Sequence, residues 1–328
     1  MNFVCSDTTL YDPELVARLS AHFSLSPVAV RTLLRRGLKT PEQIETFLHP
    51  EAQPLPDWRE MKGVEEAARL IRQAVQDGKR ICVYGDYDAD GVSASAILYR
   101  CLKKLGADVS CYIPSRHTEG YGLNENAVRR LAAAGTDVLV TVDNGISALQ
   151  ETALARSLGI AVVVTDHHRS GAEQPEADAL VSVSEGDFRE RVGDLCGAGV
   201  AWLLACALED SGGEAYLPFV AVATVADVVS LMGCNRVFVT RGLPLIRDQV
   251  GLSALLEAAA AGDGPVTENT LSFLIAPRLN AAGRMGKADT AFQLLVEDDP
   301  DRASVLALEL NENNQYTTPI CSSTHLSH

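Results

Sequence analysis

The stretch that decides the fold of this chain is Gly85-Asp86-Tyr87-Asp88-Ala89-Asp90-Gly91. A short apolar run at 80–84 precedes it and predicts a β-strand, and the residues at 93–105 predict a helix. Because side chains alternate in an extended backbone, the three carboxylates would leave the strand on the same side. Such crowded charges favour protonation unless a cation neutralises them, and Mg²⁺ and Mn²⁺ prefer oxygen ligands. The spacing therefore predicts a metal site at the carboxyl end of a strand.

The same pattern has two other interpretations. Asp-x-Asp-x-Asp-Gly also opens an EF-hand calcium loop, in which a bidentate Glu stands at the twelfth position. Counted from Asp86, that position holds Ile97, and a strand rather than a helix is predicted before the loop. A solvated acidic turn is the second alternative. The acidic and histidine clusters that follow along the chain argue against both.

Length and composition indicate a globular chain with a sizeable core. The 328 residues suit two domains, or one large α/β domain with additions, and 47% of them are hydrophobic. No run of about 18 apolar residues occurs, and the N-terminus lacks the basic and apolar regions of a signal peptide. The eight cysteines include no Cys-x-x-Cys pair, which indicates buried thiols in an intracellular chain. We therefore expect a cytoplasmic protein without a membrane partner.

The net charge of −15 excludes one class of function, a protein that coats nucleic acid through bulk electrostatics. It does not exclude a nuclease, because carboxylates that bind a metal add to the negative total and are neutralised once the metal is bound. Any binding of DNA would then depend on a few placed arginines.

A regular alternation of strands and helices begins near residue 63 and predicts a parallel, Rossmann-like sheet flanked by helices. The chain then divides into a helical N-terminal extension, an α/β domain, a helical subregion with a loop at 277–285, and a tail that we expect to be disordered or truncated. These parts cover residues 1–62, 63–235, 236–314 and 315–328. The predicted strands lie at 80–84, 108–113, 137–142 and 160–165, the helices between them at 93–105, 124–134 and 148–158, and a last helix at 299–314.

Further acidic and histidine side chains follow the later strands of this sheet. Asp143 comes directly after the third strand, where a helix cap is the alternative role. Asp166, His167 and His168 come after the fourth strand; imidazoles bind divalent metals, and Asp166 is predicted to orient one of them. Asp227 interrupts an apolar helical run at 221–229, and a buried charge needs a partner or a metal. All these groups are predicted to meet at one edge of the sheet.

These four clusters resemble motifs I to IV of the DHH phosphoesterase superfamily. The segments at 113–123 and 277–285 resemble the RecJ-like single-strand-specific 5′→3′ exonucleases, and the resemblance runs from about residue 10 to about residue 315. It implies two Mn²⁺ or Mg²⁺ ions and stepwise release of 5′-mononucleotides from single-stranded DNA with a free 5′ end. It also implies roles in DNA repair and recombination, and a single-strand-binding protein or a helicase as a partner.

Carried over by position, the resemblance implies a set of metal ligands in which Asp143 bridges the two ions. His168 would contact the scissile phosphate or donate a proton, with support of a ligand as its alternative role; Asp143 and His167 complete the catalytic set. Two ions about 4 Å apart would hold an activated water in line with the phosphorus and stabilise the departing 3′-oxygen. The implied ligands are Asp86, Asp88, Asp90, Asp143, His167 and Asp227.

Substrate contacts are predicted at five residues. Arg116, Arg278 and Arg284 suit bidentate contacts with phosphate, and Arg116 is predicted to sense a 5′-phosphate. Surface salt bridges are the alternative for each arginine. Asn280 and the small residues after it would permit close approach of the chain. Tyr121 is predicted to stack on a base, with core packing as its alternative.

Three functions remain in contention. The first is the catalytic core of a RecJ-like exonuclease. The second is a DHH phosphodiesterase acting on short oligonucleotides or cyclic dinucleotides, or a pyrophosphatase; the N-terminal helices and the arginines at 278 and 284 argue against it. The third is an inactive relative that binds DNA or partners as a scaffold, and the intact set of carboxylates and histidines argues against it. The small residues that open the helix at 196–205 are attributed to close helix packing.

Overall fold

The computed structural model describes residues 12–183 and 187–323, and the chain divides into two compact units, Met1–Gln53 and Pro54–His328. Each of the three α-helices of the first unit begins with a proline directly after a residue whose side chain caps it: Asp12, Ser26 and Thr40. The elements of this unit are α1 (Pro13–Phe23), α2 (Pro27–Arg35), α3 (Pro41–Leu48) and η1 (Pro50–Ala52).

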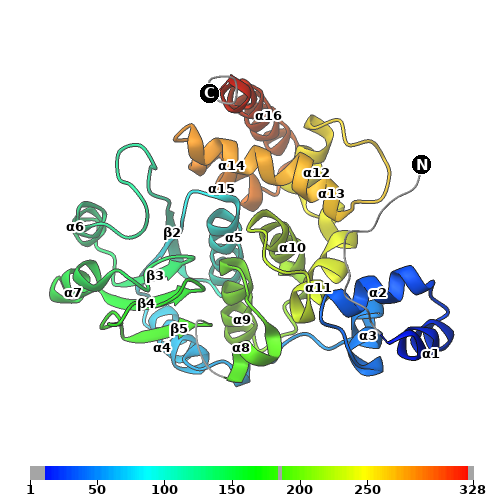
Figure 1. The fold of residues 1–328 in the computed structure, drawn as a ribbon. Coiled ribbons are helices and arrows are strands. Elements are labelled where there is room, and N and C mark those ends of the chain that lie inside the picture. The colour runs from blue at the N-terminus through cyan, green and yellow to red at the C-terminus, as the bar shows by residue number, and fades with distance from the viewer. Residues whose placement is uncertain (1–11, 184–186, 324–328) are drawn as a thin grey trace. The chain divides into compact units, whose positions relative to one another are not determined.

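The second unit is built on a five-stranded, wholly parallel sheet with the strand order β2-β1-β3-β4-β5, which confirms the predicted fold class (Figure 1). Sequence analysis did not predict the fifth strand, because four residues are too few to give a clear alternation. All five carboxyl ends lie along one edge, since the strands are parallel. The strands are β1 (Arg80–Tyr84), β2 (Asp108–Tyr112), β3 (Val138–Val142), β4 (Ala161–Asp166) and β5 (Ala179–Ser182).

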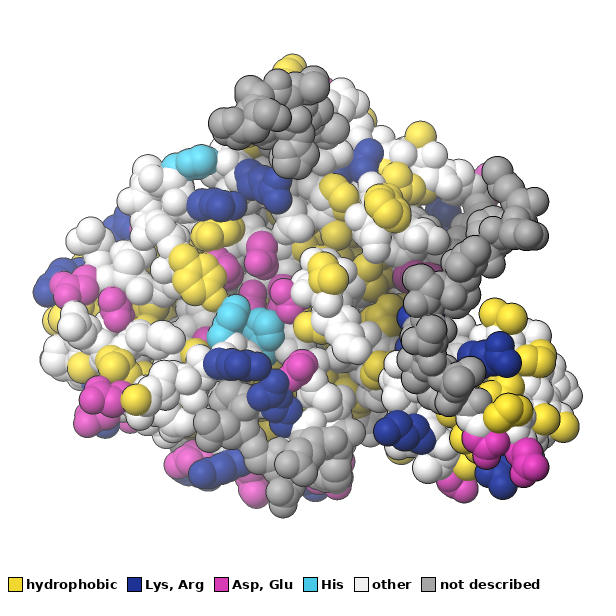
Figure 2. Space-filling model, in the orientation of Figure 1, with side chains coloured by type: hydrophobic (Ala, Val, Ile, Leu, Met, Phe, Trp, Pro, Cys, Tyr) yellow, Lys and Arg dark blue, Asp and Glu magenta, His cyan; other side chains and the backbone are white. Residues whose placement is uncertain are grey.

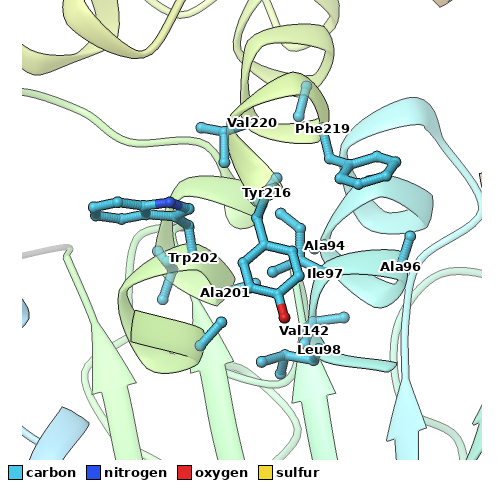
Figure 3. Close-up of a cluster of buried hydrophobic side chains, with 14 of the residues drawn as sticks. Ala94, Ala96, Ile97, Leu98, Val142, Ala201, Trp202, Tyr216, Phe219 and Val220 are labelled. Carbon is cyan, nitrogen blue, oxygen red and sulfur yellow. The ribbon is translucent and has the colours of Figure 1, made fainter. Parts of the chain in front are cut away.

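Helices cover both faces of this sheet. In β1, Ile81 and Val83 belong to one hydrophobic cluster while Cys82 and Tyr84 belong to another, as the alternation of a strand requires. The first cluster includes residues of α4 (Val64–Gln76), α5 (Ala89–Lys104) and α9 (Gly197–Glu209), and α6 (Glu125–Ala133) and α7 (Leu149–Ser157) lie on the other side (Figure 1). In Figure 3, side chains of α5, α9 and α10 gather near Val142.

The remaining elements extend the α5 face into a helical layer. Within it, α10 packs on α5 and α9, while α14 packs on α5, α15 and α16. None of the helices in the described part is long and apolar enough to cross a membrane. These elements are η2 (Trp58–Glu60), α8 (Asp187–Val192), η3 (Glu214–Tyr216), α10 (Leu217–Ala226), α11 (Gly233–Gly242), η4 (Leu243–Asp248), α12 (Val250–Ala258), α13 (Glu268–Thr270), the π-helical turn η5 (Leu271–Ile275), α14 (Ala276–Arg284), α15 (Ala288–Val296) and α16 (Pro300–Ser323).

Three features differ from the prediction. The segment at 277–285 is not a loop but most of α14, which continues directly from the π-helical turn η5. The last helix does not end at 314 but continues to Ser323, so residues 315–323 are helical where a disordered or truncated tail was predicted; whether the chain is truncated stays a prediction, and 324–328 lie outside the described residues. Residues 54–62 group with the second unit, because Met61 is buried in its core and Trp58 packs against it.

Gly283 sets how closely α14 approaches the acidic loop after β1. A Cβ added at this position would lie 2.1 Å from the carbonyl oxygen of Tyr87, which is a backbone atom with little freedom to move. The small residues of α14 therefore do permit close approach of the chain, and the segment that approaches is the acidic loop itself.

A Gly283→Ala substitution tests this contact. We expect it to lower the free energy of unfolding by about 1–3 kcal/mol, the usual cost of overpacking, in urea unfolding followed by circular dichroism. Gly212→Ala is the matched control, because nothing lies within 4 Å of its added Cβ. The control should change the value by less than about 0.5 kcal/mol. Equal effects of the two substitutions would contradict the close approach of α14.

Candidate metal centre

The acidic loop after β1 places its three carboxylates through a helix cap. Asp88 is the N-cap of α5, and its Oδ1 accepts hydrogen bonds from the backbone N–H of Asp90 and of Gly91, each at 3.0 Å. The helix therefore starts at Ala89, four residues earlier than predicted, and the expected extended backbone through all three carboxylates is wrong. Asp86 is buried just before the cap, where its Oδ1 accepts from the Tyr87 N–H at 2.8 Å.

The buried carboxylate of Asp90 reaches across to the start of α9. Its Oδ2 accepts from the Gly197 N–H at 2.6 Å and its Oδ1 from the Ala198 N–H at 2.7 Å, so it caps a helix whose own N-cap residue makes no side-chain bond. A Cβ on Gly197 would lie 2.5 Å from the Cβ of Asp143. Sequence analysis did not assign Gly197 and Ala198 to the site. Small residues at the start of a helix give the same sequence pattern whether they allow close helix packing or donate backbone hydrogen bonds to a carboxylate.

Asp143 leaves β3 in a left-handed backbone conformation, with φ of 62°, which is rare for a residue with a side chain. The turn is held by Thr141, whose Oγ1 donates to the carbonyl of Asn144 at 2.8 Å, and by the Asn144 amide, which donates to the Val142 carbonyl at 2.8 Å. Asp143 does not cap the following helix, because α7 has no side-chain cap bond, so the alternative role is excluded.

The two histidines after β4 occupy different environments. His167 Nε2 lies 3.0 Å from Asp143 Oδ1 and 3.7 Å from Asp90 Oδ2. His168 Nδ1 lies 2.7 Å from Asp166 Oδ1, and that carboxylate also accepts from the N–H of His168 and of Ile146. The prediction that Asp166 orients an imidazole is confirmed. The Tyr121 hydroxyl lies near the same ring, 3.4 Å from Nδ1 and 3.3 Å from Nε2 of His168.

Asp227 reaches the same edge from α10, although not as a buried charge. The helix ends at Ala226 and Asp227 is its exposed C-cap, so the predicted run to 229 and the burial argument are both wrong. Val228 has φ of 57° and turns the chain away at this point. The Asp227 carboxylate still lies within 4.8 Å of ligand atoms of Asp90 and His167.

Together these side chains form three groups in which every ligand atom lies within 4.8 Å of the others. The groups share Asp143 and His167, so they make one continuous cluster that includes all six predicted ligands. Figure 2 shows acidic and histidine side chains gathered on one face, with lysine and arginine side chains around them. The groups are Asp143, His167 and His168; Asp90, His167 and Asp227; and Asp86, Asp88 and Asp143.

Electrostatics make this cluster unfavourable as a set of bare charges. Burial, and then the charge of Asp88, raise the pKa of Asp86 to about 7, and burial with Asp88 and Asp227 raises that of Asp90 to about 8. Burial and Asp90 raise the pKa of Asp143 well above its usual range. Partial desolvation of the Asp227 carboxylate at the rim of the cluster, and then the charge of Asp88, raise the pKa of Asp227 to about 6. The cluster therefore favours any positive charge that enters it, either protons or a metal.

The donor set fits a hard divalent cation. The buried Asp143 Oδ1 accepts no hydrogen bond from the described residues, since the nearby His167 Nε2 lies outside hydrogen-bonding geometry. Burial and His168 lower the pKa of His167, which favours the neutral imidazole that a metal requires. Carboxylate oxygens and a neutral imidazole are ligands of Mg²⁺ and Mn²⁺.

The residues predicted to bind substrate fall into two groups. Arg116 and Tyr121 are exposed beside the cluster: the Arg116 guanidinium lies over the Tyr87 ring at 5.5 Å, and the Tyr121 ring meets His168 edge-on at 6.0 Å. Core packing of Tyr121 is thereby excluded, because its side chain is 56% exposed. Arg284 is exposed at the end of α14, and within the described residues neither it nor Arg116 forms an ion pair.

The other two residues use their polar atoms inside the protein. Arg278 is half-buried, with Nη1 donating to the Leu274 carbonyl at 2.8 Å and Nε donating to Asn311 at 2.9 Å. Asn280 Oδ1 accepts from the Ala89 N–H at 2.8 Å, which ties α14 to the first turn of α5. Arg278 therefore joins α14 to α16, and only Asn280 contacts the segment that carries the acidic cluster.

The chain is similar to known proteins in sequence and in fold. Residues 80–227 match the DHH family, N-terminal domain. The single-stranded-DNA-specific exonuclease RecJ of Bacillus subtilis is 39% identical over 306 residues, which cover 93% of this chain and 39% of that protein. The crystal structure of RecJ from Thermus thermophilus in complex with Mn²⁺ matches with a TM-score of 0.83 and 34% identity, over 96% of this chain and 46% of that one. A crystal structure of exonuclease RecJ bound to manganese matches with a TM-score of 0.75 and 39% identity, over 83% of this chain and 70% of that one.

The segment that matches the DHH family runs from the start of β1 to Asp227 and so includes all six predicted ligands. The chain belongs to this family and, within it, to the RecJ proteins. It spans about half the length of the curated relatives it matches, or less: 39% of the protein from Bacillus subtilis and 53% of that from Escherichia coli.

The raised pKa values predict how the metal-free protein responds to pH. An aspartate of the unfolded chain has a pKa of about 3.9, whereas those of Asp86 and Asp90 are raised in the folded state to about 7 and about 8. Between about pH 4 and about pH 8 the folded protein holds protons that the unfolded chain has released, so its free energy of unfolding falls as the pH rises. Bound Mn²⁺ replaces those protons and removes the penalty.

The rise in melting temperature that Mn²⁺ causes should therefore be larger at about pH 8 than at about pH 5.5. Differential scanning fluorimetry with and without Mn²⁺ measures it, and Asp143→Asn should reduce the rise at both pH values. Asp108→Asn, at the amino end of β2, is the control and should behave like the unchanged protein. If Mn²⁺ raised the melting temperature equally at both pH values, the metal would not be replacing protons on these carboxylates, and the prediction would be contradicted.

Proposed function

We propose that this chain is the catalytic part of a two-metal exonuclease that removes 5′-mononucleotides from the free 5′ end of single-stranded DNA. The observation that carries the proposal is the convergence of five carboxylates and two imidazoles at one edge of a parallel sheet. The relatives named above, which are called single-stranded-DNA-specific exonucleases, support the choice of substrate.

Two Mn²⁺ or Mg²⁺ ions fit the cluster. Asp86 and Asp88 would hold one ion, Asp90, His167 and Asp227 would hold the other, and Asp143 would contribute to both. When bound, such a pair supplies an activated water near neutral pH and neutralises charge on the attacked phosphate. The chain itself orients these ligands, through the Asp88 cap on α5 and the Asp90 contacts with α9.

His168 is proposed to act on the phosphate directly. The hydrogen bond that His168 Nδ1 donates to the Asp166 carboxylate raises the pKa of His168, which favours the imidazolium form and keeps one proton at Nδ1. The second proton at Nε2 is then available to a phosphate oxygen or to the departing 3′-oxygen. Tyr121, whose hydroxyl lies 3.3 Å from Nε2, is placed to stack on the terminal nucleotide.

Recognition of the 5′ end is assigned to the loop between β2 and α6. A cavity of about 250 Å³ opens there, lined by Ser115, Arg116, Gly283 and Gly286 among others. Arg116 offers the planar, permanently charged group that binds a terminal phosphate in a bidentate manner. With a net charge of −15, the protein has no general attraction for DNA, so such placed arginines, including Arg284, must supply the contacts.

The wider role proposed is processing of single-stranded DNA in repair and recombination, in the cytoplasm. A single-strand-binding protein or a helicase would present the 5′ end to this chain. Free thiols are found at Cys82, Cys101, Cys111, Cys196, Cys206 and Cys234, which supports a reducing compartment.

The proposal is tested by incubating the protein and Mn²⁺ with end-labelled single-stranded DNA, duplex DNA, a dinucleotide and pyrophosphate. We expect mononucleotides from the single strand alone, and Asp143→Ala should lower the rate at least about a hundredfold, because a group shared by both ions is lost. Asp108→Ala, an exposed residue at the opposite edge of the sheet, is the control and should keep full activity. Cleavage of only the dinucleotide or pyrophosphate, or activity that survives Asp143→Ala, would contradict the proposal.

A further inference from the structure

The loop between β2 and α6, residues 113–123, has no regular secondary structure, yet hydrogen bonds fix both of its ends. Tyr84 and Tyr112 are the last residues of two neighbouring strands, and their rings stack with centroids 5.3 Å apart and planes at 11°. The Tyr84 hydroxyl donates to the Gly122 carbonyl at 3.0 Å, near the end of the loop. The stacked pair therefore joins the loop to the strand that leads into the acidic cluster.

Glu119 holds the other end of the loop. Its Oε1 accepts from the Tyr112 hydroxyl at 2.6 Å, and its Oε2 accepts from the Ser115 N–H at 3.0 Å. The Glu119 N–H also donates to the Ser115 carbonyl at 2.9 Å, which closes a tight turn from 115 to 119. Arg130 of α6 donates to both Glu119 and the Tyr112 hydroxyl. Both carboxylate oxygens are thus engaged, and the side chain is only 15% exposed.

Two carboxylates, those of Glu119 and Asp289, line the cavity assigned to phosphate. Burial raises the pKa of Asp289, which favours its neutral form, so the position of Glu119 is the one that needs a physical explanation. Burial alone would raise the pKa of Glu119, but hydrogen bonds from Tyr112 and Ser115 and the charge of Arg130 hold that pKa below its usual range. Its charge is therefore offset by donors of the protein and repels an incoming phosphate little. What remains is its geometric effect on the turn, in which Arg116 directly follows Ser115.

We propose that Glu119 is a positioning residue for recognition of the 5′ end: it fixes the turn that presents Arg116 beside the metal centre. This inference rests on the proposed exonuclease function. Because the turn is ordered before substrate arrives, a terminal phosphate binds without the cost of ordering the loop. Loss of Glu119 should weaken binding of phosphorylated ends and leave the cleavage step almost unchanged.

The test compares Glu119→Gln with Glu209→Gln, a chemically matched control at the far end of α9. Glu209 likewise accepts from a tyrosine hydroxyl, that of Tyr216, and from Lys104 Nζ at 2.6 Å, and its side chain is only 7% exposed. With Mn²⁺ and a 5′-phosphorylated oligonucleotide, Glu119→Gln should raise KM about tenfold, as expected for losing a hydrogen bond to a charged group. Its kcat should stay within about twofold, and KM for the 5′-hydroxyl oligonucleotide should change little.

Three further variants and one physical readout complete the test. Arg116→Ala should reproduce the loss of preference for phosphorylated ends, whereas Arg129→Ala, an exposed arginine of α6, should not. Tyr112→Phe keeps the ring but removes the donor to Glu119, so it should give a smaller shift in the same direction. In hydrogen–deuterium exchange, the Ser115 amide should exchange faster in Glu119→Gln than in the unchanged protein.

An unchanged preference in Glu119→Gln, or an equal change in Glu209→Gln, would overturn the inference. An unchanged protein that does not discriminate between the two ends would instead contradict the proposed function, and the exchange of the Ser115 amide would then still decide whether Glu119 fixes the turn. Slow exchange in Glu119→Gln would overturn that role as well.

Discussion

Repulsion among carboxylates at the carboxyl edge of the sheet is the constraint on which the rest of this structure depends. Five aspartates lie too close together to be ionised at once without compensation, and burial adds to the cost. Folding brings them together nonetheless, because their backbone positions are fixed by strands, caps and helix starts. Packing elsewhere in the core must therefore offset the repulsion among these carboxylates, which only protons or cations reduce. Such a site is built for a metal at the expense of the metal-free protein.

Close backbone contacts keep these groups in place. Gly197 leaves no space between α9 and Asp143, and Gly283 leaves none between α14 and Tyr87, so both helices lie directly against the cluster. Asp143 itself is held in a left-handed conformation by the bonds of its turn. The loop with Arg116 and Tyr121 is tied to the same strands through the stacked tyrosines. The aspartates, the two histidines and the loop with Arg116 and Tyr121 therefore lie along the same edge of the sheet.

The sequence predicted the parallel sheet and the convergence of the acidic and histidine side chains, because both follow from local patterns: apolar runs that end in Asp or His, repeated at similar spacing. The prediction failed for features that depend on contacts between segments far apart in the sequence. Nothing near Asp90 indicates that α9, more than 100 residues later, donates to it. The apolar run before Asp227 suggested burial, although the helix ends one residue earlier and exposes the side chain. The segment at 277–285 resembled a loop because its small residues are poor evidence of a helix when their packing partner is unknown.

Counting the Mn²⁺ ions that bind each chain is the most direct test of the metal centre. Electron paramagnetic resonance measures free Mn²⁺ during a titration at neutral pH, and its line shape in the frozen state reports whether bound ions are close enough to couple. Two coupled ions per chain are expected, because two of the three ligand groups contain Asp143, so ions held by them would lie close together. Absence of binding, or two uncoupled ions, would show that these carboxylates and imidazoles do not form a single centre.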